Sequence, residues 1–154
     1  MPTPVSPSSR NLHRLQVLIV DDMPQVRQEL RLLLTLAGEL EVVGEAANGV
    51  EAIGQVEALR PDVVVMDLEM PVMDGYTAAR RIKAQWPACR VIALTVHDGE
   101  AERQRAAQAG VDAFIVKGAP LDVLVKAIIE NNEHQYGQAG EALPRLQEHT
   151  GGAS

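Results

Sequence analysis

Five polar residues stand at the ends of apolar stretches that have the length of buried strands. They are Asp21, Asp22, Asp67, Thr95 and Lys117. Three carboxylates in one crevice would repel one another and raise their own pKa values unless a cation neutralised them. A hard divalent ion such as Mg²⁺ would do so, and a lysine and a threonine hydroxyl would bind an anion beside it. Together these groups have the chemistry of a phosphoryl-transfer site with a carboxylate nucleophile.

Each of these residues, taken alone, has a simpler explanation. An aspartate at the end of a strand is usually a turn or capping residue, and a lysine there is usually solvated. A threonine that ends a strand reflects ordinary β-propensity. The interpretation as a reactive site therefore depends on whether the fold brings the five side chains together.

The elements that would position them alternate along the chain. Apolar stretches predict five strands, at residues 16–20, 41–46, 62–67, 90–95 and 112–117. Apolar residues at helical spacing predict five helices, which begin near Pro24, Val50, Asp74, Asp98 and Pro120. Asp74 and Asp98 are the expected N-caps of the third and fourth of these helices. Strands that are apolar along their whole length are typical of a parallel sheet covered on both faces. With right-handed crossovers, the sequence predicts an α/β fold: a flavodoxin-like, doubly wound sheet of strand order 2-1-3-4-5.

In such a sheet the carboxyl ends of all strands lie along one edge, and ligands bind where the strand order reverses. For this order the reversal lies between the first and third strands, so we expect Asp21, Asp22 and Asp67 to meet there. Thr95 and Lys117 would approach the same edge from the other strands. The predicted fold therefore turns five scattered residues into one site.

The composition is that of one domain with polar ends. The 154 residues are 46% hydrophobic and only 3% aromatic, so we expect an aliphatic core. The net charge of −7 disfavours nonspecific binding to nucleic acids or anionic membranes, and no stretch approaches the roughly 18 apolar residues of a membrane span. We expect a disordered lead at residues 1–14, the domain at 15–131, and a polar tail at 132–154 that is mostly disordered or one short helix. The single cysteine, Cys89, fits a reducing compartment, so we expect a cytoplasmic protein.

Five stretches resemble the receiver domain of two-component response regulators, and together they run from about Val17 to Ile129. They read VLIVDDMPQVR, VVGEAANGVEAI, PDVVVMDLEMPVMDGYTAARRIK, VIALTVHD and AGVDAFIVKGAP. The wording is most similar to the subfamily that usually carries a C-terminal helix-turn-helix. The resemblance implies that Asp67 accepts a phosphoryl group from a histidine kinase, with Mg²⁺ as cofactor. It implies a signalling domain, not an enzyme beyond its own phosphorylation and dephosphorylation.

The resemblance also implies how the acidic residues divide their roles. Asp22, Asp67 and the backbone carbonyl of Glu69 would bind Mg²⁺ directly, and Asp21 would act mainly through water. Glu69 and His97 would flank the path of the water that hydrolyses the acyl phosphate. We therefore hypothesise that Glu69 and His97 tune autodephosphorylation, the alternative being that both are solvated loop residues.

The remaining residues would bind the phosphoryl group and transmit its presence. Thr95 would bond a phosphoryl oxygen, and Lys117 would pair with the group. Phe114 stands where the family has its switch aromatic, often a tyrosine. Because Phe114 has no hydroxyl, packing alone would drive its rotamer change. Phosphorylation would shift the Thr95 and Phe114 face and alter partner binding or dimerisation.

Two features depart from the family pattern. The family commonly has Lys-Pro with a cis peptide after its fifth strand, whereas this chain has Lys117-Gly118-Ala119-Pro120. A cis bond between Lys117 and Gly118 would be costly, and the sequence leaves it open. The residues after Ile129 are too few and too acidic for a DNA-binding domain, so we expect no direct nucleic-acid binding. The chain is either a single-domain receiver with a downstream protein partner or one whose C-terminal output domain is missing.

Some apolar residues lie off the core stripes of the first and last predicted helices. They are Leu32, Leu36, Val123 and Ile129. Because these two helices are neighbours in this fold, the four residues predict a homodimer face, although single exposed leucines are ordinary. The predicted helix EAERQRAAQAG has only alanines to bury, and such weak packing would suit a segment that shifts on activation.

Two other functions are consistent with parts of the pattern. A phosphohydrolase of the haloacid dehalogenase type also uses a strand-end aspartate, but it would need a second aspartate where this chain has Glu69. A binding module with the same fold that is never phosphorylated is the other alternative. The complete set of acidic, threonine and lysine residues argues against the binding module.

Overall fold

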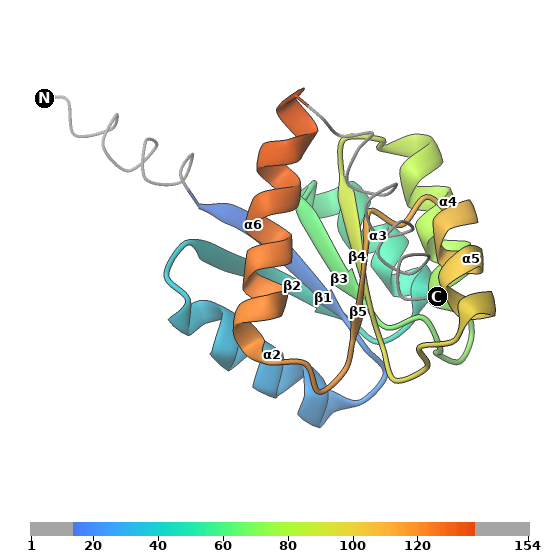
Figure 1. Cartoon of the computed structure of the whole chain (residues 1–154), viewed down its shortest axis with the longest axis horizontal. Helices are drawn as coiled ribbons and strands as arrows, with labels where there is room; N and C mark the ends of the chain where they lie inside the picture. Colours follow the sequence, from blue (N-terminus) through green and yellow to red (C-terminus); the bar gives the residue numbers. More distant parts are fainter. Residues whose placement is uncertain (1–13, 138–154) are drawn as a thin grey trace, which may run out of the picture.

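The computed structural model describes residues 14–137, and the side chains among them as far as Glu130. Within these residues, strands and helices alternate as the sequence predicts (Figure 1). The strands are β1 (Leu15–Val20), β2 (Leu40–Ala46), β3 (Val63–Met66), β4 (Arg90–Thr95) and β5 (Ala113–Val116). The helices are α2 (Pro24–Leu36), α3 (Gly49–Leu59), α4 (Gly75–Gln85), α5 (Glu100–Gln108) and α6 (Leu121–Gly137).

The strands form one parallel sheet of order β2-β1-β3-β4-β5, which confirms the flavodoxin-like topology. Strand β1 pairs with β3 in the register that sets Val20 opposite Met66. The residues that follow these two, Asp21 and Asp67, therefore emerge side by side at the carboxyl edge. The backbone N–H of Asp67 donates to the carbonyl of Val20 at 2.9 Å, which extends the pairing by one residue.

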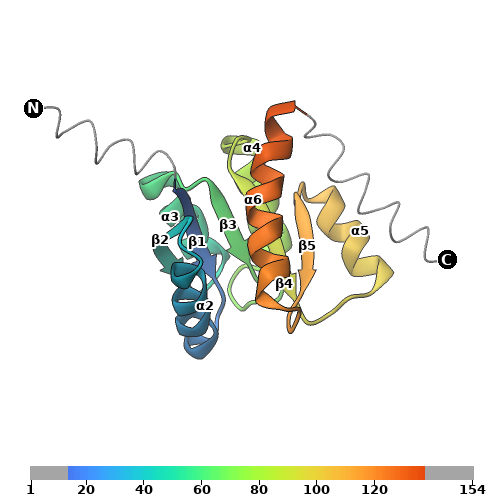
Figure 2. The same cartoon turned by 60° about the vertical axis from the view of Figure 1, so that its left-hand side comes forward.

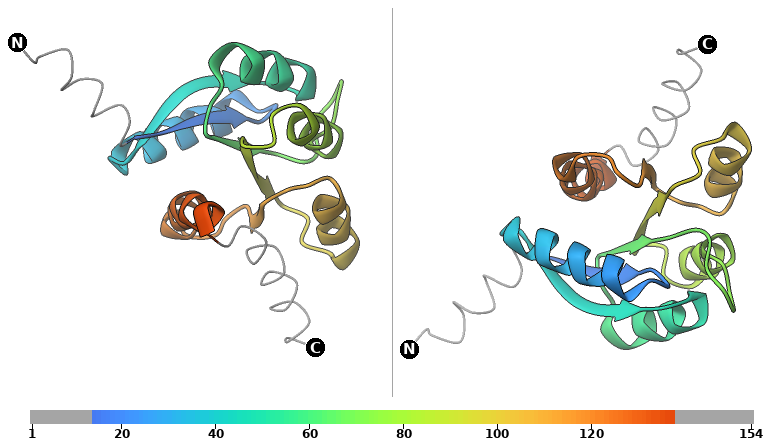
Figure 3. Two further views of the ribbon diagram at one scale, coloured as in Figure 1. Left: turned by 90° about the horizontal axis from the view of Figure 1, so that it is seen from above. Right: turned by 90° about the horizontal axis from the view of Figure 1, so that it is seen from below.

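The helices cover both faces of the sheet, so each strand buries both sets of its alternating side chains. In β1, Val17 and Ile19 point to the face covered by α2 and α6. Leu18 and Val20 point to the opposite face. The turned views show α3, α4 and α5 on that face and α2 and α6 on the other (Figures 2 and 3). Burying a Val, Leu or Ile side chain contributes about 1.5–3 kcal/mol. The aliphatic core therefore holds the strand ends in fixed positions.

Strands β3 and β5 are each one residue shorter at both ends than the apolar pattern predicts, and an aspartate precedes each of them. Asp62 lies before β3, where its carboxylate accepts from the N–H of Gln16 at 2.8 Å. Asp112 lies before β5 and accepts from the N–H of Val91, also at 2.8 Å. The backbone N–H groups of Asp62 and Asp112 also donate to the carbonyls of Gln16 and Val91, at 2.9 and 2.8 Å. Each aspartate therefore binds the neighbouring strand through both its backbone and its side chain.

The helix starts follow local capping chemistry. Asn48 and Asp74 each accept a hydrogen bond from the backbone N–H three residues on, at 2.9 and 2.8 Å, so they cap α3 and α4. The expected cap of α5 is wrong: Gly99, not Asp98, precedes the helix. The carboxylate of Asp98 instead binds Arg103, with Nε and Oδ1 2.7 Å apart.

The structure also decides the geometry of the Lys117–Gly118 bond, the burial of Ile129 and the state of the Cys89 thiol. The Lys117–Gly118 bond is trans, since the described residues contain no cis peptide, and Gly118 instead takes φ +96°. Ile129 was expected off the core stripe, but it packs partly buried against the core. Burial raises the pKa of the Cys89 thiol to about 11, so this cysteine stays protonated and unreactive, as expected of a structural residue.

The ends of the chain are only partly described. Helix α6 continues to Gly137, past the domain boundary that the sequence predicts at residue 131. The rest of the expected polar tail, 138–154, and nearly all of the expected lead, 1–13, lie outside the described residues. In the part of the chain that the structure covers, no helix is long and apolar enough to cross a membrane.

The start of α4 packs directly on the backbone of the strand-end aspartate. A methyl group on Gly75 would fall well inside contact distance of the Asp67 carbonyl and would lie 2.7 Å from the Leu68 Cα. The N–H of Gly75 also donates to the Leu68 carbonyl at 2.9 Å. Only glycine allows this approach, so Gly75 helps to fix where Asp67 lies.

We predict opposite effects for two Gly→Ala substitutions. Gly75→Ala should destabilise the protein by about 1–3 kcal/mol, because backbone must move to make room. Gly54→Ala, in the interior of α3 with open space around it, should stabilise the protein by about 0.5–1 kcal/mol. Urea unfolding of both variants measures this. Equal effects of the two substitutions would contradict the close packing at Gly75.

Candidate functional site

Asp67 lies at the centre of the carboxyl edge of the sheet. It follows β3 directly, is 7% exposed, and is flanked by the buried residues Met66 and Leu68. Its Oδ1 accepts from the backbone N–H of Glu69 at 3.1 Å. The other carboxylate oxygen faces a lysine. The apolar strand thus presents one carboxylate to the crevice in a fixed orientation.

The two aspartates after β1 lie next to Asp67. Asp21 is 1% exposed and its Oδ1 accepts from the N–H of Met23 at 2.9 Å, whereas Asp22 is exposed. Carboxylate oxygens of Asp21, Asp22 and Asp67 all lie within 4.8 Å of one another. The structure therefore brings together the three carboxylates that the sequence pattern indicates.

Lys117 reaches the carboxylates from the end of β5. Its Nζ lies 2.8 Å from Asp21 Oδ2 and 3.3 Å from Asp67 Oδ2. Burial by itself would lower the pKa of Lys117, but the hydrogen bonds and opposite charges of Asp21 and Asp67 outweigh it and raise the pKa. Lys117 is therefore protonated at neutral pH and bridges two acidic groups from distant parts of the chain.

The pKa of Asp67 is raised above its ordinary value. Burial is the largest cause, and the charge of Asp21 adds to it. The hydrogen bond from Glu69 and the charge of Lys117 act in the opposite direction without compensating fully. A carboxylate of this kind is made more stable by additional positive charge.

The donor set at this edge fits Mg²⁺. Its oxygens are hard ligands, two of the three carboxylates are buried, and the third faces solvent, from which water ligands would come. One lysine neutralises only part of the charge of three clustered carboxylates. Asp21, Asp22 and Asp67 are thus suited to hold a small divalent cation.

The sequence analysis missed Arg27, which lies on the first turn of α2 beside the acidic pair. Its Nη1 donates to the backbone carbonyl of Asp21 at 2.6 Å, and its Nε pairs with Glu45 of β2 at 3.0 Å. The pKa of Glu45 is lowered, chiefly by a hydrogen bond from Arg31 and to a smaller extent by the one from Arg27. Arg27 therefore fixes the backbone of the acidic pair. Its position one turn after the aspartates was the only signal in the sequence.

Thr95 lies at the end of β4, and Glu69 and His97 lie on the loops that follow β3 and β4. Thr95 ends β4, is buried, and its Oγ1 accepts from the N–H of His97 at 3.2 Å. The side chains of Glu69 and His97 lie 2.9 Å apart at Oε2 and Nδ1, and each is about half exposed. Glu69 and His97, which the sequence groups only through the resemblance to the family, are therefore in direct contact.

Phe114 lies further from the acidic residues, in the middle of β5. Its ring is buried on the face covered by α3, α4 and α5. The guanidinium of Arg103 lies over this ring, 4.7 Å from its centroid. Phe114 is thus packed inside the domain beneath α5.

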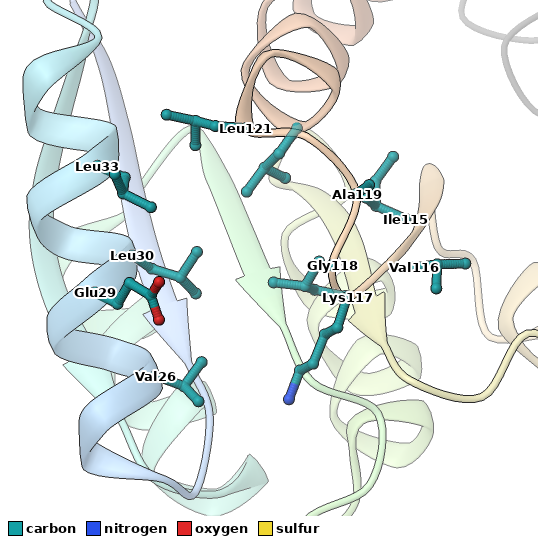
Figure 4. Close-up of a pocket in the computed structure, with 12 residues that line it drawn as sticks. Val26, Glu29, Leu30, Leu33, Ile115, Val116, Lys117, Gly118, Ala119 and Leu121 are labelled. Carbon is teal, nitrogen blue, oxygen red and sulfur yellow. The ribbon is translucent and has the colours of Figure 1, made fainter.

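A pocket of about 380 Å³ opens on the other face, between α2 and the start of α6 (Figure 4). Its wall is largely apolar, with Leu30 and Leu33 on one side and Leu121 and Leu124 on the other. The side chain of Lys117 also lines it. The lysine therefore belongs both to the acidic site and to the space between these two helices.

Comparison with known families agrees with this geometry. The model of the response regulator receiver domain matches residues 17–129. The chain belongs to this family. The family match favours a signalling receiver over the haloacid dehalogenase alternative, and it falls within the domain predicted at residues 15–131.

Relatives of this receiver include two curated regulators. The response regulator VraR of Staphylococcus aureus is 43% identical over 132 residues, which are 86% of this chain and 63% of that protein. An uncharacterised transcriptional regulatory protein, YhcZ of Bacillus subtilis, is 39% identical over 112 residues, 73% of this chain and 52% of that protein. The receiver thus spans between half and two thirds of the length of these relatives.

Solved structures agree in fold. The signal receiver domain of the NarL response regulator from Mycobacterium tuberculosis has a TM-score of 0.75 at 32% identity, covering 79% of this chain and 98% of that one. A LuxR-family regulator from Aurantimonas has a TM-score of 0.76 at 30% identity, covering 87% and 98%. The match covers nearly the whole of each solved chain, and the second protein is described as a response regulator of the LuxR family.

We predict that Asp67→Asn stabilises the protein when Mg²⁺ is absent. The folded-state pKa of Asp67 is raised, so the ionised carboxylate opposes folding above that pKa. The gain in unfolding free energy should be largest at neutral pH. It should disappear as the pH falls through the raised folded pKa towards the unfolded value.

Urea unfolding in EDTA, from neutral pH to about pH 4, measures this gain. Glu57→Gln, on the exposed side of α3, is the control and should change stability by less than about 0.5 kcal/mol. An Asp67→Asn protein that is less stable than the wild type at neutral pH would contradict the electrostatics described here.

Proposed function

We propose that the chain is a phosphorylation-dependent signalling receiver in which Asp67 accepts a phosphoryl group from a histidine kinase. The observation that supports this most is the environment of the Asp67 carboxylate. It is buried, it lies within 4.8 Å of the oxygens of Asp21 and Asp22, and Lys117 approaches it to 3.3 Å. This set has a nucleophile, metal ligands and a cation for an anionic product.

The residues divide the transfer among them. A carboxylate oxygen of Asp67 attacks the phosphorus, and the N–P bond of the kinase phosphohistidine breaks with its electron pair returning to the imidazole. Lys117 pairs with the phosphoryl oxygens, and Thr95 bonds one of them through its hydroxyl. Bound Mg²⁺ would supply charge that offsets the incoming phosphoryl group. Its direct ligands would be Asp22, Asp67 and the backbone carbonyl of Glu69, with Asp21 acting through water.

The phosphorylated receiver would act on a downstream partner. Phosphorylation would change the positions of Thr95 and Phe114 and alter the binding of a downstream partner, or of an output domain beyond this chain. A regulator similar to this chain is named as a DNA-binding response regulator of the LuxR family. Histidine kinases act in the cytoplasm on such receivers, so we place this one there. The intact acidic and lysine set argues against a module that is never phosphorylated.

We predict that acetyl phosphate and Mg²⁺ phosphorylate the wild-type protein once per chain, because the site supplies everything except the donor. Asp67→Asn should abolish this modification, since the amide is not a nucleophile. Lys117→Met should reduce the rate about 10-fold or more, because a charge-assisted contact in the transition state is lost. Intact-mass spectrometry follows the added phosphate. An equally phosphorylated Asp67→Asn protein would exclude the proposal.

We further propose that the contact between Glu69 and His97 tunes the lifetime of the acyl phosphate. The pair joins the loops after β3 and β4, on either side of Asp67 and Thr95. A joined pair restricts the approach of water to the phosphoryl group. Because the pair is exposed, its energy is modest, about 0.2–1 kcal/mol.

Glu69→Ala and His97→Ala should therefore each shorten the acyl-phosphate half-life by roughly two- to fivefold. The double variant should be no worse than the single ones, since either substitution already removes the contact. Lys126→Ala, on the exposed surface of α6, is the control. Loss of phosphate is followed by mass spectrometry after the donor is removed. Unchanged half-lives in both single variants would show that these are merely solvated loop residues.

We also propose that phosphorylation favours a homodimer through α2 and α6. Leu32 and Leu36 on α2 are 60% and 72% exposed, and Val123 on α6 is 40% exposed. They lie on the same two helices whose residues Leu33 and Leu124 line the apolar pocket. Such a surface gains free energy when a second copy covers it.

Leu36→Ser should therefore weaken dimerisation in the presence of beryllofluoride and Mg²⁺ without affecting the fold. Val50→Ser removes another exposed apolar side chain, from α3, and should leave dimerisation unchanged. Sedimentation velocity distinguishes monomer from dimer. A wild-type protein that stays monomeric with and without beryllofluoride would rule out this face.

A further inference from the structure

Helix α5 is attached to the domain in an unusual way. Of its nine residues, only Ala106 is buried, so it has no apolar stripe to hold it. Instead, two of its arginines lie over aromatic rings of neighbouring elements. Arg103 lies 4.7 Å from the centroid of Phe114 in β5, and Arg105 lies 3.9 Å from that of Tyr76 in α4. Cations over buried rings therefore supply part of the attachment that apolar packing lacks.

Arg103 has a second partner that Arg105 does not share. Its Nε donates to Oδ1 of Asp98 at 2.7 Å. Asp98 lies in the loop between β4 and α5, beside His97, whose imidazole contacts Glu69. One guanidinium thus contacts both the loop that borders the acidic site and the ring beneath α5.

We propose that Arg103 is a positioning residue that couples the β4–α5 loop at the phosphorylation site to Phe114. The inference rests on the proposed function of Asp67 and adds to it a way of transmitting phosphorylation. Phe114 has no hydroxyl, so its polar contact in this structure is the cation on its face. A displacement of the loop carries Asp98 with it and must either move Arg103 or break the contact with the carboxylate.

The coupling has a direction. The contacts of Arg103 hold the loop and the ring in the arrangement described above. Phosphorylation that moves either group must work against them. Removing the guanidinium should therefore make the phosphorylated arrangement easier to reach, while its neighbour Arg105, which lacks the contact to the loop, should matter little.

The chain contains a single phenylalanine, so 4-fluorophenylalanine labels Phe114 alone and gives one ¹⁹F signal. The signal of the full chain is followed during titration with beryllofluoride in the presence of Mg²⁺, and its change gives the midpoint concentration. In the wild type the signal should shift. In Arg103→Gln the starting signal should itself move, and the midpoint should fall roughly threefold or more.

Asp98→Asn separates the two contacts of Arg103, because it weakens the one to the loop and leaves the cation over the ring. Its starting signal should stay close to that of the wild type, while its midpoint falls in the same direction as that of Arg103→Gln. Arg105→Gln is the matched control on the same helix and should keep the wild-type midpoint within about 1.5-fold.

Four results would overturn the coupling. Midpoints of Arg103→Gln and Asp98→Asn that both equal the wild-type value would leave Arg103 with a packing role only. An equal fall in Arg105→Gln would point to a general loosening of α5. A wild-type ring signal that ignores beryllofluoride while acetyl phosphate still modifies Asp67 would also reject the coupling and keep the proposed function. If acetyl phosphate did not modify Asp67, both the coupling and the proposed function would be rejected.

Discussion

The arrangement depends on one electrostatic constraint, which is that two buried carboxylates share one lysine. Asp21 and Asp67 are nearly inaccessible to solvent, and Lys117 contacts both at 2.8 and 3.3 Å. The two carboxylates raise the pKa of Lys117 despite its burial, yet the charge of the lysine does not restore the ordinary pKa of Asp67. The site therefore has less positive charge than its three carboxylates need for neutralisation. That shortage suits a pocket that takes up a divalent cation and then a phosphoryl group.

The sheet holds these carboxylates close together in spite of their mutual repulsion. Strands β1 and β3 are adjacent and in register, so the residues that follow Val20 and Met66 meet without any long loop. Apolar side chains on both faces keep these strand ends from relaxing away from one another. The close approach of Gly75 to the Asp67 backbone adds a further restraint. The free energy of core burial thus offsets the repulsion that the acidic edge would otherwise suffer.

The sequence predicted the topology and the central residues, because both follow from periodicity and from the rule that parallel strands end at one edge. Arg27 and Arg103 could not be found this way. Each acts through a long side chain that crosses to another element, and no spacing in the chain encodes that reach. Asp98 misled the capping argument for the same reason, since its carboxylate binds Arg103. Ile129 packs partly against the core because the apolar face of the last helix is wider than the core stripe predicted from the sequence.

The central claim is that Asp67, and no neighbouring carboxylate, forms the acyl phosphate. Borohydride reduces an acyl phosphate on aspartate to homoserine, which marks the modified residue permanently. After treatment with acetyl phosphate and Mg²⁺, peptide mass spectrometry of the reduced protein should locate homoserine at position 67 and leave Asp21 and Asp22 unchanged. Homoserine at either of those two aspartates, or none at position 67, would contradict the account.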